Sequence, residues 1–224
     1  NGITVENTLL DLLIFLLPDI KKLTFSGRTD AGVHANMQVV TFKSHHFIPL
    51  NNIKKFVNSS ENYIRVNKIS IVDNNFDARK SAISREYVYC FTADLIPLYL
   101  QDYVTYFNGI FNKDLMESYF ALFRKSGSGK KSSVRNIYKI YLEEFEYQLL
   151  TDSQKSIKIY KVYISANGFL YRMIRNIMGC LFYILEKNIS LKTFKSSFNE
   201  NKRYFNFKPA SASGLYLNKI EYNE

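Results

Sequence analysis

Residues 24–36 read TFSGRTDAGVHAN and place one carboxylate, Asp30, in a short loop beside an arginine. Gly27 and Gly32 bracket this loop and permit backbone turns that other residues disfavour. The residues just before it are typical of the end of a buried strand, and residues 38–43 are typical of the strand that follows. Asp30 is therefore expected at a strand–loop–strand junction, where rigid flanks hold a reactive side chain in place.

The neighbour of this carboxylate is Arg28. A cation within about 4–6 Å keeps a carboxylate ionised and therefore nucleophilic. An isolated R-x-D is more often an ordinary loop salt bridge than a reactive pair. The residues around the pair, and three further stretches of the chain, decide between these two interpretations.

Four stretches resemble, in the same order, the motifs of the TruA family of tRNA pseudouridine synthases. Residues 27–34, GRTDAGVH, are similar to the catalytic loop G-R-T-D-x-G-V-H. Residues 76–91, FDARKSAISREYVYCF, are similar to the strand F-x-A-R-x-S-A-x-x-R-x-Y-x-Y. Residues 167–181, NGFLYRMIRNIMGCL, resemble the helix F-L-x-x-M-V-R-N-I-V-G, and residues 208–222, KPASASGLYLNKIEY, resemble the closing strand A-x-x-G-L-x-L-x-x-V-x-Y. The resemblance covers essentially the whole chain.

The resemblance implies a role for each residue that matches a functional position of the family. Asp30 is the nucleophile, and Arg175 pairs with it and keeps it ionised and oriented. Tyr87 stacks on the target uracil and helps to remove the C5 proton. Phe169 and Leu170 help to form the wall of the uracil pocket.

The implied reaction breaks the N1 glycosidic bond of a uridine, turns the uracil and rejoins it through C5 without a cofactor. The attack of Asp30 on C1′ of the ribose or on C6 of the base stays open. The target nucleotide has to leave the RNA stack, and Arg28 is expected to fill the vacated space or to grip the backbone. Five further cations are candidate RNA contacts: Arg79, Arg85, Arg172, Lys130 and Lys131. Arg79 and Arg85 are phosphate contacts or structural pairs.

The substrate implied is the anticodon stem and loop of tRNA, at positions 38, 39 and 40 in the family, and the family works as a homodimer. Two alternatives stay open: a eukaryotic-type relative that acts on other tRNA uridines, and a retired or truncated tRNA-binding module. G-V-H rather than G-V-S after the aspartate favours the bacterial type, in the cytoplasm of a bacterium or in an organelle of bacterial ancestry.

The helix expected over residues 169–187 supports the role of Arg175 independently of the resemblance. Its apolar residues form a stripe, and Arg172 and Arg175 share a different face. An arginine in so apolar a helix needs a carboxylate partner. Gly179 is expected where the helix packs closely against its surroundings, because a helical glycine otherwise costs about 1 kcal/mol. Tyr89 is expected in the core.

Composition supports a polyanionic partner without identifying it. The 224 residues include 30 Lys and Arg against 20 Asp and Glu, a net charge of +10. An AT-biased genome also raises the lysine content of the proteins that it encodes. The two cysteines and three histidines lack the spacing of metal ligands, so no metal is predicted. The longest apolar run, at residues 9–17, is too short to span a membrane.

We expect an α/β (α+β) fold of the pseudouridine synthase type, with a mainly antiparallel central sheet, flanking helices and two similar lobes around a cleft. Residues 1–124 are the expected N-terminal catalytic lobe, 125–134 a basic flexible loop and 135–224 the C-terminal lobe. A basic loop of this kind is either an RNA contact or a plain linker. Helices are predicted from Val5 to Pro18 and at 113–124, 169–187 and 190–199, and strands at 38–43, 63–72, 84–92, 137–147, 156–164 and 215–222.

Family members begin with a strand that carries Y-D-G-x-x-Y-x-G-x-Q before the T-V-E-x-x-L helix. This chain opens with NGITVENTLLDLL, already in that helix. We therefore expect a fragment or a processed product, in which the absence of the first strand would leave one sheet edge bare.

Overall fold

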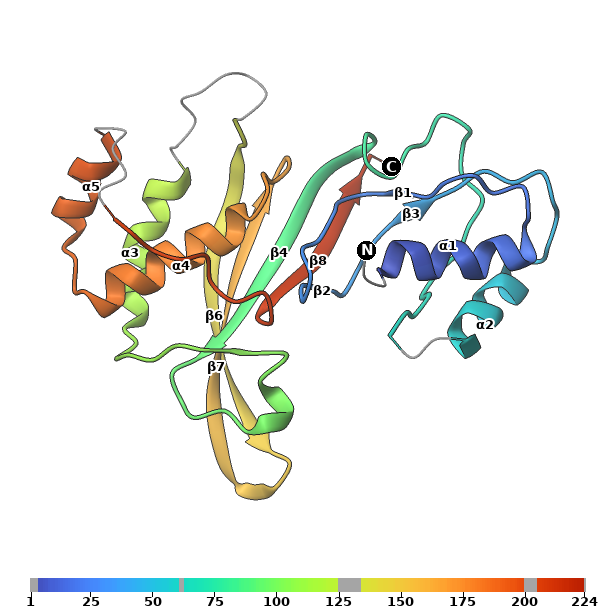
Figure 1. The fold of residues 1–224 in the computed structure, drawn as a ribbon. Coiled ribbons are helices and arrows are strands. Elements are labelled where there is room, and N and C mark those ends of the chain that lie inside the picture. The colour runs from blue at the N-terminus through green and yellow to red at the C-terminus, as the bar shows by residue number, and fades with distance from the viewer. Residues whose placement is uncertain (1–3, 61–62, 125–133, 200–204, 224) are drawn as a thin grey trace. The chain divides into compact units, whose positions relative to one another are not determined.

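The computed structural model describes residues 4–60, 63–124, 134–199 and 205–223, which divide into two compact units (Figure 1). The first unit comprises the residues up to Arg28 together with Gln38–Ala82. The second comprises Thr29–Met37 together with Ile83–Tyr222. The predicted loop at 125–134 lies almost entirely outside the described residues, so the division into lobes at this loop stays a prediction.

Two helices form most of the core of the first unit. Helix α1, Val5–Leu16, begins after Thr4, whose hydroxyl oxygen accepts a hydrogen bond from the backbone N–H of Asn7 at 3.1 Å. Such a cap satisfies one of the free N–H groups at a helix start. Helix α2, Leu50–Ser60, packs against α1. The apolar core that they share comprises Leu9, Leu13, Leu17, Ile20, Leu23, Ile53, Val57 and Ile64.

The structure corrects the prediction of a strand at residues 63–72, because no strand is present there. Val66 donates its backbone N–H to the side chain of Asn58 at 2.7 Å, and its carbonyl oxygen accepts from the same side chain at 3.1 Å. The backbone groups that a neighbouring strand would satisfy are thus bonded to helix α2. Three of the β-branched residues that suggested a strand contribute to the core instead: Ile64 is buried in it, and Val66 and Ile69 pack against it.

The reactive loop leaves the first unit from a short two-stranded sheet. Strand β1, Thr24–Phe25, pairs antiparallel with β3, Val40–Thr41, so the predicted strand at 38–43 is confirmed but shorter. Gln38 closes the base of the loop, because its side-chain amide donates to the carbonyl oxygen of Gly27 at 2.9 Å and its amide oxygen accepts from the hydroxyl of Ser26.

The second unit is built on a six-stranded sheet whose order is β2-β8-β4-β7-β6, with β5 paired to β4. Antiparallel pairing joins β4 to β7 and β6 to β7, whereas β2 runs parallel to β8 and β5 parallel to β4. The predicted, mainly antiparallel sheet is therefore confirmed. The strands are β2, His34–Ala35; β4, Ala82–Thr92; β5, Thr105–Tyr106; β6, Ile137–Leu149; β7, Asp152–Ala166; and β8, Leu215–Tyr222.

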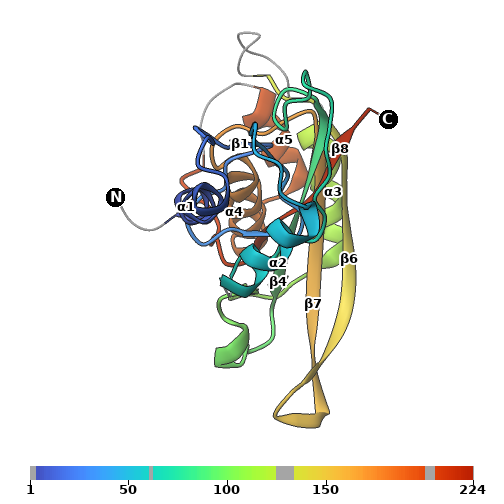
Figure 2. The ribbon, with the colours of Figure 1, turned by 90° about the vertical axis from the view of Figure 1, so that its right-hand side faces the viewer.

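Three helices lie on one side of this sheet, and the hairpin of β6 and β7 projects beyond the other strands (Figures 1 and 2). The helices are α3, Lys113–Arg124; α4, Met173–Glu186; and α5, Leu191–Asn199. Alternate residues of β4 face them: the rings of Tyr89 and Phe91 meet Phe182 of α4, with centroids 6.0 and 5.1 Å apart. Tyr89 is fully buried, which confirms its predicted place in the core.

Helix α4 begins four residues later than predicted, at Met173 rather than at residue 169. Arg172 caps it with φ 55° and ψ 13°, in the left-handed region. A side-chain-bearing residue in that region cannot continue a right-handed helix, so residues 169–172 form a bend. Arg172 therefore lies outside the helix, which corrects the predicted start of the helix.

Gly179 confirms the predicted close packing of α4. A Cβ atom at this position would lie 2.1 Å from the carbonyl oxygen of Lys208 and 3.0 Å from the backbone nitrogen of Ala210. One turn earlier, the N–H of Ala210 donates to the carbonyl oxygen of Arg175 at 2.9 Å. The absence of a side chain at Gly179 thus allows the segment from Lys208 to Ala210 to lie directly on the helix.

We predict that Gly179→Ala destabilises the protein although alanine favours helix. The added methyl group would force backbone to move, which costs about 2 kcal/mol of unfolding free energy and exceeds the gain of about 1 kcal/mol in helix propensity. Urea unfolding of both proteins measures the difference. Glu186→Ala, at an exposed position of the same helix, is the control, and equal stability of the two variants would contradict the close packing.

Candidate functional site

The loop that carries Asp30 is anchored to the sheet of the second unit. His34 and Ala35 pair with Tyr216 and Leu217 of β8. The N–H groups of the next two residues, Asn36 and Met37, both donate to the carbonyl oxygen of Leu217, at 2.9 and 3.3 Å. Four consecutive residues after the loop are thereby fixed, so the position of the loop is set by the sheet.

The histidine of the GRTDAGVH stretch has a structural role in this anchor. The ring of His34 stacks on Tyr216 and on Tyr103, with centroids 4.7 and 5.3 Å apart. Its Nε2 atom donates to the carbonyl oxygen of Asp102 at 2.7 Å. His34 therefore orders the end of the loop and is occupied by contacts within the protein.

Gly32 makes the tight turn of the loop possible. Its φ of 79° lies in the left-handed region that favours glycine, and the N–H of Val33 donates to the carbonyl oxygen of Asp30 at 3.1 Å. A Cβ atom on Gly32 would also meet the Cβ atom of Ala212 at 3.3 Å. The turn thus brings Asp30 back toward the segment that precedes β8.

The structure brings Asp30 and Arg175 together, although 145 positions separate them in the sequence. The Nη1 atom of Arg175 donates to Oδ2 of Asp30 at 2.9 Å, and the two side chains are only 16% and 19% exposed. The Nε atom of the same guanidinium donates to the carbonyl oxygen of Ala210 at 2.8 Å. Since two of its nitrogen atoms are engaged, the guanidinium plane is fixed and presents one charged edge to the carboxylate.

A second arginine contacts the same carboxylate oxygen. The Nε atom of Arg172 lies 3.8 Å from Oδ2 of Asp30, and this side chain is 45% exposed. Its guanidinium lies over the ring of Tyr171, 4.9 Å from the centroid. Both ion pairs of Asp30 are thus made by arginines of the bend and helix at 172–175, rather than by its sequence neighbour Arg28.

Tyr87 lies in the same region, packed edge to face against Phe169 with ring centroids 5.2 Å apart. Only 8% of it is exposed. Burial raises the pKa of Tyr87 to about 12, and the charge of Asp30 adds to this rise whereas Arg85 opposes it. The phenol therefore stays protonated near neutral pH and lies within electrostatic reach of the carboxylate.

The other predicted site residues are placed less tightly. Leu170 is exposed, in the bend before α4. Arg85 donates from Nη1 to the carbonyl oxygen of Asn167 at 3.1 Å, beside this bend. Arg28 and Arg79 are exposed and belong to the first unit. Lys130 and Lys131 lie outside the described residues.

Two residues of the site were not identified from the sequence. Ala210 supplies the carbonyl oxygen that fixes Arg175, and Tyr171 supplies the ring under Arg172. Ala210 lies within the closing stretch KPASASGLYLNKIEY, so the motif resemblance identified the segment that contains it. A contact through a backbone oxygen leaves no signature in residue type, however, and an exposed tyrosine is not distinctive in a chain with 17.

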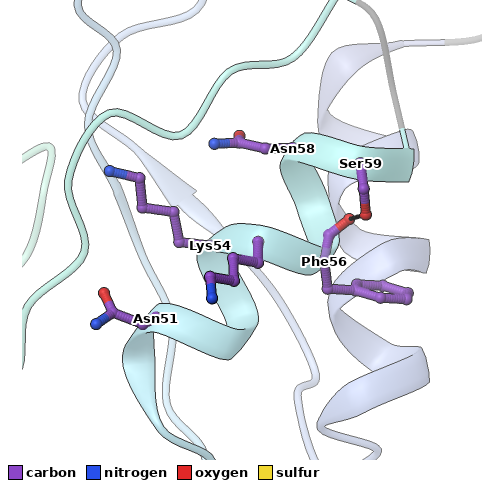
Figure 3. A pocket seen from close by; sticks show the side chains of 6 residues that line it. Asn51, Lys54, Phe56, Asn58 and Ser59 are labelled. Atoms are coloured by element: carbon purple, nitrogen blue, oxygen red, sulfur yellow. Dashed lines mark hydrogen bonds between the residues drawn. The ribbon is translucent and has the colours of Figure 1, made fainter.

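A surface pocket lies over helix α2 in the first unit (Figure 3). Its lining comprises Asn51, Lys54, Lys55, Phe56, Asn58 and Ser59. Lys54 donates to the carbonyl oxygen of Asn67 at 2.7 Å, and Asn58 bonds both backbone groups of Val66. These side chains hold residues 66 and 67 against α2, so the pocket is part of the packing of those residues.

Within the part of the chain that the structure describes, no group of three or more His, Cys, Asp or Glu side chains gathers as metal ligands would. Within the same residues, no helix combines the length and the apolar character needed to cross a membrane.

Comparisons with known proteins agree with one another. The sequence model of a family described as tRNA pseudouridine synthase matches residues 117–223. The chain is 31% identical to the tRNA pseudouridine synthase A of Thermodesulfovibrio yellowstonii, over 99% of this chain and 91% of that protein. It is 34% identical to the protein of the same name from Prochlorococcus marinus, over 100% and 84%, and 33% identical to that of Dictyoglomus thermophilum, over 98% and 90%.

We predict that Asp30 and Arg175 are energetically coupled. Asp30→Asn and Arg175→Met each lower the unfolding free energy, and the double variant loses about 1 kcal/mol less than the sum, because the second change removes a group that already lacks its partner. Chemical unfolding of the four proteins measures the coupling. The more exposed pair of Asp152 and Lys155 serves as a control cycle with much weaker coupling. Additive losses at Asp30 and Arg175 would contradict the pairing.

The raised pKa of Tyr87 predicts a specific loss of stability at high pH. The unfolded chain ionises this phenol near pH 10 and the folded protein near pH 12, so the stabilisation is complete below pH 10 and is lost as the pH rises toward 12. Between pH 9 and pH 11, Tyr87→Phe should therefore lose about 1 kcal/mol less unfolding free energy than the unchanged protein. Urea unfolding at both pH values tests this, and equal losses in the two proteins would refute it.

Proposed function

The chain belongs to the TruA family of tRNA pseudouridine synthases and is itself a tRNA pseudouridine synthase. From this premise we propose that it isomerises uridines in the anticodon stem and loop of tRNA, with Asp30 as the nucleophile. One observation carries the assignment of Asp30: its carboxylate is held 2.9 Å from Arg175 and within electrostatic reach of the buried ring of Tyr87. A fixed carboxylate beside an aromatic ring suits covalent chemistry on a flat base.

The isomerisation neither adds nor removes atoms from the nucleoside. The bond from N1 to C1′ breaks, C5 bonds to C1′ in its place, the proton leaves C5, and N1 gains a proton. Asp30 attacks C1′ of the ribose or C6 of the base. Both arginine contacts of Asp30 are to Oδ2, and among the described residues no hydrogen bond or ion pair engages Oδ1. We therefore assign the attack to Oδ1, while Oδ2 stays bound to Arg175.

Tyr87 is proposed to stack on the target uracil, with Phe169 supporting it from the side. The edge-to-face packing of the two rings fixes the plane of Tyr87, and its burial excludes water from this side of the base. A pKa of about 12 leaves almost no phenolate near neutral pH. The raised pKa thus favours the stacking role of Tyr87 over a role as the base that removes the C5 proton.

Arg175 is proposed as the residue that positions Asp30. Its planar guanidinium donates in two directions, to Asp30 and to the carbonyl oxygen of Ala210. A lysine retains the charge but cannot make both bonds in a fixed plane. The function of Arg175 therefore depends on its shape as well as on its charge.

The remaining contacts are proposed to bind the RNA outside the reacting base. Leu170 extends the wall of the uracil pocket, Arg28 occupies the space of the extruded nucleotide, and Arg79 and Arg85 contact phosphates, as Lys130 and Lys131 do. The net charge of +10 supports a polyanionic partner. Assembly as a homodimer stays a prediction.

We predict that Asp30→Asn abolishes the release of tritium from tRNA that carries C5-tritiated uridine, because an amide cannot replace a carboxylate nucleophile. Binding of tRNA should change by no more than a few fold, since the amide retains the shape of the side chain. Asp114→Asn, which changes an exposed carboxylate of α3, is the control and should retain full activity.

Turnover by Asp30→Asn would refute the assignment of the nucleophile. A chain that binds tRNA but shows no tritium release even with Asp30 intact would be a retired tRNA-binding module. Mapping the pseudouridines formed in the tRNA tests the anticodon stem and loop as the target.

A further inference from the structure

Arg172 contacts Asp30 although the carboxylate already has a closer partner. The distance from Nε of Arg172 to Oδ2 of Asp30 is 3.8 Å, beyond hydrogen-bond range, whereas Arg175 lies at 2.9 Å. If Arg172 moves away, Asp30 still keeps one cation at hydrogen-bond distance. The contact of Arg172 is thus weak and can be broken without leaving the carboxylate unpaired.

The charges around Asp30 do not balance. One carboxylate faces two guanidinium groups, which leaves an excess of one positive charge. This excess lies on the more accessible arginine, because Arg172 is 45% exposed whereas Arg175 is 16% exposed. A single exposed positive charge beside a nucleophile matches the single negative charge of a phosphodiester.

An exposed aromatic ring lies directly beneath this charge. Tyr171 is 74% exposed, and the guanidinium of Arg172 is 4.9 Å from its centroid. Exposed aromatic rings bind unstacked RNA bases by stacking, and arginine adds to such binding. Tyr171 and Arg172 thus offer the two kinds of contact, stacking and charge, that one nucleotide requires.

The bend before α4 places both side chains next to Asp30. Arg172 has φ 55°, a value that arginine adopts rarely and that asparagine tolerates better. In the described part of the chain, the other non-glycine residue with a positive φ is Asn188. The substitution of Arg172 by asparagine is therefore compatible with the backbone and removes only the charged side chain.

We propose that Tyr171 and Arg172 bind the nucleotide adjacent to the target uridine. Its base stacks on Tyr171, and Arg172 leaves Asp30 to bind its phosphate. Asp30 then has Arg175 as its single cation, and the excess charge is neutralised by the RNA. This inference rests on the proposed function, since it assigns part of the same substrate to residues beside the same nucleophile.

The test uses Arg172→Asn and Tyr171→Ala in the full chain, with unmodified tRNA transcripts as the probe. Arg172→Asn should weaken binding about 10-fold and lower the slope of log affinity against log salt by about one, because one phosphate contact is lost. Tyr171→Ala should weaken binding about 10-fold without changing this slope, whereas Tyr171→Phe should retain affinity. The effect should fall on the affinity for tRNA, and the rate of pseudouridine formation at saturating tRNA is measured beside it.

Tyr138→Ala, which removes an exposed tyrosine of β6, is the matched control and should retain affinity. Unchanged affinity and salt slope in both variants would overturn the inference. A loss of rate at saturating tRNA in Arg172→Asn with normal binding would also overturn it, because Arg172 would then act on Asp30 alone. Thermal unfolding should show no destabilisation of Arg172→Asn. If the unchanged protein binds tRNA but forms no pseudouridine, the proposed function fails, whereas the binding measurements still decide the inference.

Discussion

The paired hydrogen bonds of Arg175 are the interaction on which the site depends. One guanidinium joins the loop of Asp30, helix α4 and the segment that precedes β8, through bonds of 2.9 Å to the carboxylate and 2.8 Å to the carbonyl oxygen of Ala210. All three elements belong to the second unit. The geometry of the nucleophile is therefore fixed within one unit, although the loop also continues into the first.

The segment from Lys208 to Gly214 makes this arrangement possible through close backbone contacts. It lies on α4 at Gly179 and on the turn of the Asp30 loop at Gly32. At Gly214 it lies on β4, where a Cβ atom would be 2.4 Å from the carbonyl oxygen of Cys90. Two glycines from distant parts of the chain, Gly32 and Gly179, thus meet this segment, and its own Gly214 meets β4. A side chain at any of the three would move the segment away.

The sequence predicted most of the elements and the central ion pair of the site, but it was wrong about one strand and about the start of α4. Helix α1, strand β4 and the antiparallel sheet follow from periodicity, and the meeting of Asp30 with Arg175 follows from motif resemblance and from the need of a buried arginine for a partner. The prediction of a strand at 63–72 was wrong because the side chain of Asn58, rather than a neighbouring strand, bonds to the backbone of Val66. The predicted start of α4 was wrong because the residue type does not indicate that Arg172 adopts a left-handed backbone conformation.

The left-handed backbone of Arg172 and the largely buried ion pair of Asp30 with Arg175 have a common physical explanation. Each is unfavourable in isolation, because φ above zero strains a long side chain and a desolvated charge needs compensation. Both persist because α4 is packed firmly, with Met178, Leu181 and Ile184 fully buried. The apolar core thus holds a charged site in a conformation that the site residues would not adopt alone, and Arg172 is the more exposed of its two cations.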